Sequence, residues 1–222
     1  MKKILIAFLI FTSISVYSQE KKLSFGIDII PSVNWTATNT KDAKNDGVSA
    51  GISYGANLTA LRGQNWGFLT GVRMSHLNFN VKYNYLFGFQ TYDSLYSSIS
   101  SGSSVEYKMQ QIEVPLGFSF RSREIGYTTI TGEVGVIPAY CIKTKVNINS
   151  ANISRETAKN EISMFSAGYF LGGGVLYSLG GSTAIKAMLS FSSGLTDLTT
   201  DKNSKEDHVY YYRLGLTLGI IF

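Results

Sequence analysis

The sequence contains little cysteine, proline or histidine. Its 222 residues include one cysteine, Cys141, so a disulfide bond within the chain is excluded. Three prolines stand against 22 glycines, 14 tyrosines and 13 phenylalanines, a composition that favours strands over helices. The two histidines, His76 and His208, lie far apart and no Cys/His spacing recurs, so we expect no metal site and no cofactor.

A strong excess of one sign of charge is also missing. Lys and Arg number 20 against 15 Asp and Glu, which gives a formal net charge of +5. The basic residues are scattered singly along the chain, whereas a nucleic-acid site gathers them on one face. We therefore expect no nucleic acid among the partners.

Long apolar runs are missing except at the start of the chain. Met1-Lys2-Lys3 precedes an apolar run from Ile4 to Ile14, and small residues follow up to Ser18. This is the layout of a secretory signal peptide, and its core is shorter than the roughly 20 residues of a transmembrane helix. We expect a cleaved signal peptide of residues 1–18 and one β-barrel domain of residues 19–222. Cleavage removes two lysines and lowers the net charge to 18 − 15 = +3.

Alternation of apolar and polar residues runs through the rest of the chain, and a period of two predicts β-strands. The apolar face of the last strand carries Tyr210, Tyr212, Leu214, Leu216, Leu218, Ile220 and Phe222. Seven further segments show the same alternation: residues 23–35, 51–60, 66–83, 112–120, 125–140, 162–179 and 185–192. The sequence therefore predicts eight strands.

The connections between these strands alternate strictly between long and short. The long ones lie near residues 36–47, 84–104, 145–160 and 195–207, and the short ones at 62–65, 121–124 and 180–182. Transmembrane barrels have long extracellular loops, short periplasmic turns and an even number of strands. The pattern predicts an all-β fold, an eight-stranded antiparallel up-and-down transmembrane β-barrel with four long extracellular loops and three short periplasmic turns. The last strand, ending at Phe222, is expected to close it against the strand near Leu23.

The interior of an eight-stranded barrel has room only for side chains. Glycines and polar residues suit this lumen, whereas leucines and phenylalanines suit lipid. Three cations and three anions fall on the small-residue face, and we expect them to form a lumen charge network that plugs the barrel: Asp28, Arg73, Glu113, Glu133, Lys186 and Arg213.

Aromatic residues are expected in two girdles at the lipid boundaries. At the short-turn end these are Trp66, Phe68, Phe120, Tyr127, Tyr177 and Phe222. At the long-loop end they are Trp35, Tyr83, Tyr107, Tyr140, Tyr169 and Tyr210. Aromatic core residues of a soluble sandwich are the alternative interpretation.

The segment Ile112-Glu113-Val114-Pro115-Leu116 resembles the PorT-like outer-membrane β-barrel family of Bacteroidetes. Ser18-Gln19, the aromatic-glycine start Trp66-Gly67-Phe68 and the apolar last strand closed by phenylalanine are similar to that family as well. The resemblance covers most of residues 19–222 and implies fold and location. The namesake of the family takes part in secretion and gliding machinery. The resemblance also implies an insertion signal, read by the outer-membrane insertion machinery, in Phe222, Ile220 and Leu218.

Candidate chemistry is sparse. Glu113 lies next to Pro115 in mid-strand, and we favour a structural role in which it neutralises Arg73 or Arg213 over a kink that aims it at a lumen partner. His208 has Asp207 and Ser204 nearby at the rim, but neighbours on a strand point to opposite faces. We therefore expect a protein that is not an enzyme.

The second long loop differs from the other loops, which are rich in Ser, Asn, Thr and Lys, because it carries aromatic residues. These form a possible partner-binding loop, although the same residues would also fit an extension of the hairpin above the membrane: Tyr85, Phe87, Phe89, Tyr92 and Tyr96.

The sequence thus predicts a non-enzymatic protein of the cell outer membrane with a structural or adhesive role, or a role as an accessory to a secretion complex. Its expected partners are outer-membrane lipid, the insertion machinery and secretion-complex proteins. The alternatives are a small rim-sited enzyme acting on lipid or peptide, a solute channel and a soluble lipocalin-like binding barrel.

Overall fold

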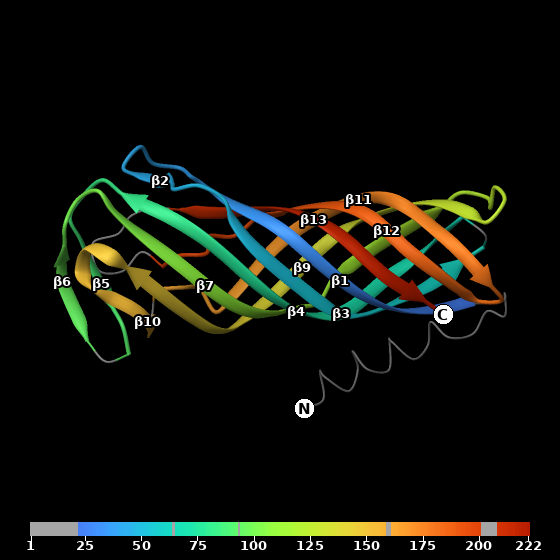
Figure 1. Ribbon diagram of the computed structural model, residues 1–222, viewed down its shortest axis with the longest axis horizontal. Helices are drawn as coiled ribbons and strands as arrows, with labels where there is room; N and C mark the ends of the chain where they lie inside the picture. Colours follow the sequence, from blue (N-terminus) through green and yellow to red (C-terminus); the bar gives the residue numbers. More distant parts are fainter. Residues whose placement is uncertain (1–21, 64, 93, 159–160, 201–207) are drawn as a thin grey trace, which may run out of the picture.

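The structure of the protein, a computed structural model, describes residues 22–63, 65–92, 94–158, 161–200 and 208–222. The predicted signal peptide, Ser204 and Asp207 lie outside these residues. Over the described ranges, no helix has the length and apolar character needed to cross a membrane. The molecule is an elongated antiparallel barrel (Figure 1). Four short strands gather at the end away from the C-terminus: β2 (Ala43–Asn45), β5 (Phe87–Gln90), β6 (Leu95–Ile99) and β10 (Ile153–Thr157).

Within the described ranges, eight strands form the barrel wall, one of them in two pieces. They follow one another around the wall in chain order: β1 (Lys22–Thr38), β3 (Ser49–Arg62), β4 (Trp66–Tyr83), β7 (Ser103–Glu113) with β8 (Leu116–Arg121), β9 (Thr128–Ile148), β11 (Phe165–Gly180), β12 (Thr183–Gly194) and β13 (Val209–Ile221). β1 pairs with β13 and closes the wall, with backbone hydrogen bonds in both directions between Phe25 and Phe222. The predicted eight-stranded antiparallel fold is confirmed.

β7 and β8 are two parts of one strand, because both pair with β4 on one side and β9 on the other. The interruption falls at Val114 and Pro115, and proline has no N–H to donate to a ladder. The alternation continues across it, since Glu113, Pro115 and Ser119 all point into the barrel and are buried. Pro115 therefore interrupts the backbone hydrogen bonds of the strand without changing which side chains face the interior of the barrel.

We call the part of the wall that begins at the short turns its lower part, and the opposite part its upper part. The lower part has apolar side chains on the outside. On β1 this exposed face starts at Leu23. Two aromatic residues bound the segment above it: Phe25, which stacks on Phe222, and Trp35, which stacks on Tyr212. At about 3.4 Å per residue and a tilt of about 40°, this segment rises about 26 Å along the barrel axis. That height matches the apolar band of about 25 Å in outer-membrane barrels.

Side-chain polarity reverses in the upper parts of β4, β7 and β9. On β4, Leu77, Phe79, Val81 and Tyr83 are buried inside the barrel, whereas the intervening Asn78, Asn80 and Lys82 face outward. A soluble barrel has this arrangement, with its apolar face inside. The reversed segments, together with β2 (Ala43–Asn45), β5 (Phe87–Gln90), β6 (Leu95–Ile99) and β10 (Ile153–Thr157), form a unit that we call the distal lobe.

The reversal corrects the predicted girdle at the long-loop end. Tyr83 and Tyr107 are fully buried in the lobe, with their hydroxyls 3.3 Å apart, because their strands continue well beyond the apolar band. The aromatic residues that do lie outside at the upper edge of the band are Trp35, Tyr140, Phe165, Tyr169, Phe191 and Tyr212.

The long connections contain more structure than the sequence predicts. β9 runs to Ile148, beyond its predicted end at Tyr140, and a bulge at Ile142 shifts its phase, so that Cys141 and Thr144 both face inward. β10 then pairs back onto β9. A short 3-10 turn, η1 (Asn149–Ala151), connects the two strands. β5 and β6 form a separate two-stranded hairpin.

Candidate functional site

The centre of the lumen is occupied by an ion pair between two opposite sides of the wall. Arg213 of β13 donates from Nη1 and Nη2 to the two carboxylate oxygens of Glu113 of β7, at 2.9 and 3.2 Å. The same guanidinium donates to three hydroxyls, those of Ser53, Ser75 and Ser192. Arg213 and Glu113 thus form a bidentate arginine–carboxylate pair, which is among the strongest hydrogen-bonded pairs in proteins.

A second cluster of charges lies nearer the short-turn end. Lys186 Nζ is 2.7 Å from Glu133 Oε1 and 3.5 Å from Asp28 Oδ2. The Asn57 amide also donates to Asp28, at 2.7 Å. Two anions therefore share one cation, and the four side chains come from β1, β3, β9 and β12.

The structure brings all six predicted charges of the lumen network into the interior, each less than a tenth exposed. Arg73 is the direct cross-strand neighbour of Glu113 and adds a third cation. The remaining cavity at this level is about 20 Å³, with Arg73, Glu133 and Arg213 among its lining residues, so it has room for about one water molecule. Side chains therefore fill the cross-section of the lumen here.

Above the charges, the distal lobe has its own apolar core. Phe79 stacks on Tyr107 at 5.0 Å between ring centroids, and Tyr83 lies 4.6 Å from Phe87 of the hairpin. The core consists of Ala43, Leu77, Phe79, Val81, Tyr83, Phe87, Phe89, Ile99, Val105, Tyr107, Met109, Val146, Ile148, Ile153, Leu198, Val209 and Tyr211. The β5–β6 hairpin thus covers the top of the lobe.

This packing buries some residues of the predicted partner-binding loop and leaves another exposed. Phe87 and Phe89 are fully buried in the lobe core, so the expectation that they present a binding surface is wrong. Tyr85 packs against the same core, and Tyr96 packs there too while its hydroxyl donates to Glu156 at 3.4 Å. Tyr92 alone of the five predicted residues is well exposed, at 74%. The alternative interpretation, a hairpin above the membrane, describes most of the loop.

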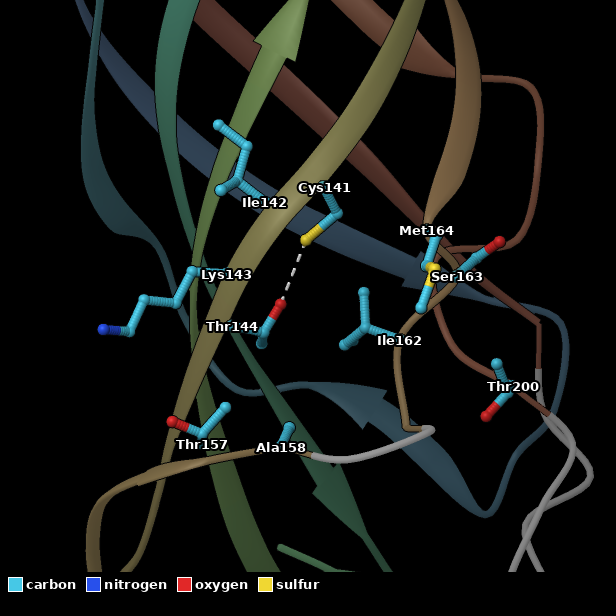
Figure 2. A pocket seen from close by; sticks show the side chains of 10 residues that line it. All are labelled: Cys141, Ile142, Lys143, Thr144, Thr157, Ala158, Ile162, Ser163, Met164 and Thr200. Carbon is cyan, nitrogen blue, oxygen red and sulfur yellow. Dashed lines mark hydrogen bonds between the residues drawn. The ribbon is translucent and has the colours of Figure 1, made fainter. Parts of the chain in front are cut away.

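Two hollows open on the sides of the lobe. The first is a cavity of about 400 Å³ at the β9 bulge. Figure 2 shows Cys141 and Thr144 facing Ile162 and Met164 across it, with Cys141 Sγ 3.2 Å from the Thr144 hydroxyl, whereas Lys143 points to the other side of β9. The second is a groove of about 500 Å³, lined by Asn80, Ser100, Ser101, Gly102, Ser103, Ser104, Glu106, Asn147, Asn149 and Ser150.

Glu106 is the charged residue of the second hollow. It accepts a hydrogen bond from the Asn147 amide and forms an ion pair with Lys108 at 3.0 Å. Partial burial raises the pKa of its carboxyl, but the hydrogen bonds and the lysine charge outweigh burial and hold the pKa below its usual value. Glu106 is therefore an anion at neutral pH.

A histidine and an acid meet at the rim, although they are not the neighbours considered from sequence. His208 Nδ1 lies 2.9 Å from Asp197 Oδ2. The other Asp197 oxygen accepts hydrogen bonds from the backbone N–H groups of Thr199 and Val209 and from the Thr199 hydroxyl. The pair joins the end of β12 to the start of β13. No group of three or more His, Cys, Asp or Glu side chains suited to a metal ion occurs within the described part of the chain.

The three residues of the predicted insertion signal lie on one face at the end of the chain, Leu218 and Ile220 in β13 and Phe222 directly after it. Leu218, Ile220 and Phe222 are all exposed on the outside of the barrel, within the apolar band. They lie beside β1, with which β13 pairs.

A closed antiparallel sheet with an apolar belt and a charged interior defines a transmembrane β-barrel. The chain belongs to the family described as "Outer membrane protein beta-barrel domain", whose model matches residues 17–200. It is therefore an outer-membrane protein. No curated protein matches the chain.

Several solved barrels are similar to this chain. Ail, the attachment invasion locus protein of Yersinia pestis, is 15% identical, with 92% of this chain and 100% of that chain covered and a TM-score of 0.46. Neisserial surface protein A is 10% identical, with 90% and 98% covered and a TM-score of 0.47. The outer membrane protease OmpT of Escherichia coli is 9% identical, with 94% and 99% covered and a TM-score of 0.45.

Proposed function

We propose that this protein is a non-enzymatic surface protein of the outer membrane, which uses its distal lobe to bind a protein partner. The observation that carries the proposal is the reversal of side-chain polarity in β4, β7 and β9. About 9–11 residues of a tilted strand cross the hydrocarbon, yet β4 has 18 residues and β9 has 21. The additional residues build a packed lobe beyond the membrane surface.

The lobe faces outside the cell in this proposal. Barrels of this class keep their short turns in the periplasm, and the lobe lies at the opposite end from those turns. The cleaved signal peptide of residues 1–18 is part of the same proposal, since the chain has to cross the inner membrane. A lumen filled by buried charges supports a binding role over that of a solute channel.

Tyr92 and Leu95, at the turn of the β5–β6 hairpin, are the exposed apolar side chains best placed for a partner. The hairpin is held in place from below, because the Tyr92 N–H donates to the Thr157 carbonyl at 2.9 Å and Gln90 N–H donates to Glu161 at 2.8 Å. A fixed backbone with exposed apolar side chains lowers the entropy cost of binding.

Orientation is tested first, by labelling single cysteines in intact cells with a maleimide that does not cross membranes. In a Cys141→Ser background, we expect Ser101→Cys on the lobe to react and Arg123→Cys on a short turn to react only after lysis. The reverse pattern would place the lobe in the periplasm and overturn the proposal.

The partner is then sought with a photo-crosslinking amino acid at position 92 and, as the matched control, at position 123. Crosslinks from position 92 to proteins of other cells or of the medium support an adhesive role. Crosslinks to components of the same outer membrane support a role as an accessory to a secretion complex, which is the PorT-like interpretation. Equal crosslinking from both positions would contradict the lobe as the binding surface.

A rim-sited enzyme acting on lipid or peptide is the second candidate, and the Asp197–His208 pair favours it. An acid that orients a histidine is a recurrent part of hydrolytic sites. Its test is hydrolysis of lipid and peptide substrates by the purified protein and by His208→Ala. Turnover that the substitution abolishes would establish the enzyme.

A further inference from the structure

Basic side chains lie on the outside of β7 and β9, directly above the apolar band. Strand register places Met74, Ile112 and Tyr140 side by side as the last apolar row. The next row along the strands is His76, Gln110 and Lys143. The row after that is Asn78, Lys108 and Lys145. We call Lys108, Lys143 and Lys145 the lysine cluster.

The cluster brings like charges together. Lys108 and Lys145 are direct cross-strand partners, and Lys143 is two residues from Lys145 on the same face. Like charges placed opposite one another in antiparallel strands are destabilising. Glu106 pairs with Lys108, and these four side chains still sum to +2. An anion bound between the lysines would remove this repulsion.

The height of the cluster fits the lipid head groups. Along β7, Gln110 and Lys108 lie two and four residues above Ile112, which corresponds to about 5 and 10 Å along the barrel axis. Head groups occupy about 5–8 Å on each side of the hydrocarbon. The flexible lysine side chains therefore reach the level at which lipid phosphates lie.

The groove lined by serine and asparagine lies immediately above the cluster. Its floor is the next row along the strands, Asn80, Glu106 and Asn147. Hydroxyl, amide and carboxylate groups are the hydrogen-bonding partners that sugar hydroxyls require. From the membrane outward, the same three strands thus present an apolar surface, then cations, then a polar groove.

We propose that this face of the barrel binds a phosphorylated glycolipid of the outer leaflet. Its acyl chains lie along Ile112, Tyr140 and Ile142. Its phosphate is bound by Lys108, Lys143 and Lys145, and its saccharide occupies the groove above. Figure 2 supports this arrangement, because Lys143 points away from the cavity at the bulge. The proposal rests on the outward orientation of the lobe.

The test uses the full chain folded in phosphatidylcholine nanodiscs and measures its binding to lipopolysaccharide. The triple substitution Lys108→Gln, Lys143→Gln and Lys145→Gln removes the cluster. The matched control, Lys41→Gln, Lys44→Gln and Lys82→Gln, removes three lysines nearer the tip. We expect the first triple variant to weaken binding at least about tenfold and the control to change it less than about twofold. Glu106→Gln, which removes the negative charge that pairs with Lys108, is expected to strengthen the binding of lipopolysaccharide.

Equal losses in the two triple variants would overturn the proposal, because they would show attraction by net charge alone. Equal binding of phosphatidylglycerol vesicles, dephosphorylated lipopolysaccharide or free inorganic phosphate would overturn it as well, since each lacks at least one of the three chemical parts. A shift in gel mobility on boiling, equal to that of the unmodified protein, shows that both variants fold. This assay does not depend on orientation, so its failure is distinct from a failure of the cysteine labelling.

Discussion

Arg213 and Glu113 lie 100 residues apart in the sequence and meet through two hydrogen bonds in the middle of the barrel. Glu113 is completely buried, and Gln111 also donates to it at 2.9 Å. The pair connects β13 to β7 across the lumen, so the charges act as an internal brace between opposite walls.

Glu113→Gln is expected to destabilise the barrel by about 3–5 kcal/mol, because it leaves a buried arginine without its counter-charge. Urea unfolding in detergent measures this loss. Glu124→Gln at an exposed turn is the control and should change the free energy of unfolding by less than about 0.5 kcal/mol. Replacing both partners by leucine should cost less than the single substitution, and a larger loss would contradict this account of the pair.

Gly219→Ala is expected to destabilise the barrel by about 1–3 kcal/mol through overpacking. A Cβ at Gly219 would collide with the Asp28 carboxylate, which has to stay near Lys186. Gly173→Ala is the matched control, because a Cβ there meets nothing within 4 Å. Similar unfolding midpoints for the two variants would show that the lumen has spare room beside Asp28.

Phe89→Ala is expected to loosen the distal lobe without affecting the membrane-spanning wall. Loss of a buried phenylalanine costs about 3–5 kcal/mol, and this loss falls on the hairpin. Hydrogen exchange of residues 87–99 should rise sharply, whereas that of β1 should not change. Tyr92→Ala, at the exposed turn of the same hairpin, should exchange like the unmodified protein. Faster hydrogen exchange of the hairpin in both variants would contradict this prediction, because it would show that Tyr92 contributes to the packing of the lobe as Phe89 does.

Phe222→Ala is expected to reduce insertion into the outer membrane in cells while leaving refolding in detergent unchanged. This difference would separate a signal read by the insertion machinery from a contribution to stability. Leu216→Ala, on the same outer face of β13 but within the middle of the band, is the control. Parallel losses in cells and in detergent would assign Phe222 a packing role with Phe25 only.

Purified protein in a planar bilayer should show no steady conductance, since side chains fill the lumen around Arg213. Steady openings of uniform size in the unmodified protein would contradict the filled lumen and revive the channel interpretation. The Glu113→Gln variant serves as the comparison, because a weakened brace is expected to give brief and irregular openings.

The alternation in the sequence predicts the strands and their phase well. The segment 66–83 matches β4 at both ends, and the lumen-facing positions of β13 are those expected from Arg213. Closure of the sheet also follows, because a membrane-spanning sheet has to pair its edges.

Alternation alone could not predict the distal lobe. A period of two shows which residues share a face of a strand, but it does not show which face lies inside the barrel. Tyr83 has the same phase as Arg73, and both point inward. The signal was present in Asn78, Asn80 and Lys82, whose polarity requires an outer surface in water. The Asp197–His208 contact is different, since a loop joins the two residues and alternation carries no information about it.

The pairing of Phe25 with Phe222 has a consequence for the order in which the molecule forms. The wall closes only when β1 finds β13, so the contact that completes the barrel has nearly the greatest sequence separation in the chain. Contacts of this kind form slowly, and a sheet that waits for them exposes unpaired edges meanwhile. Biogenesis of this protein should therefore depend on holding the chain apart from other unfolded chains until its last strand is available.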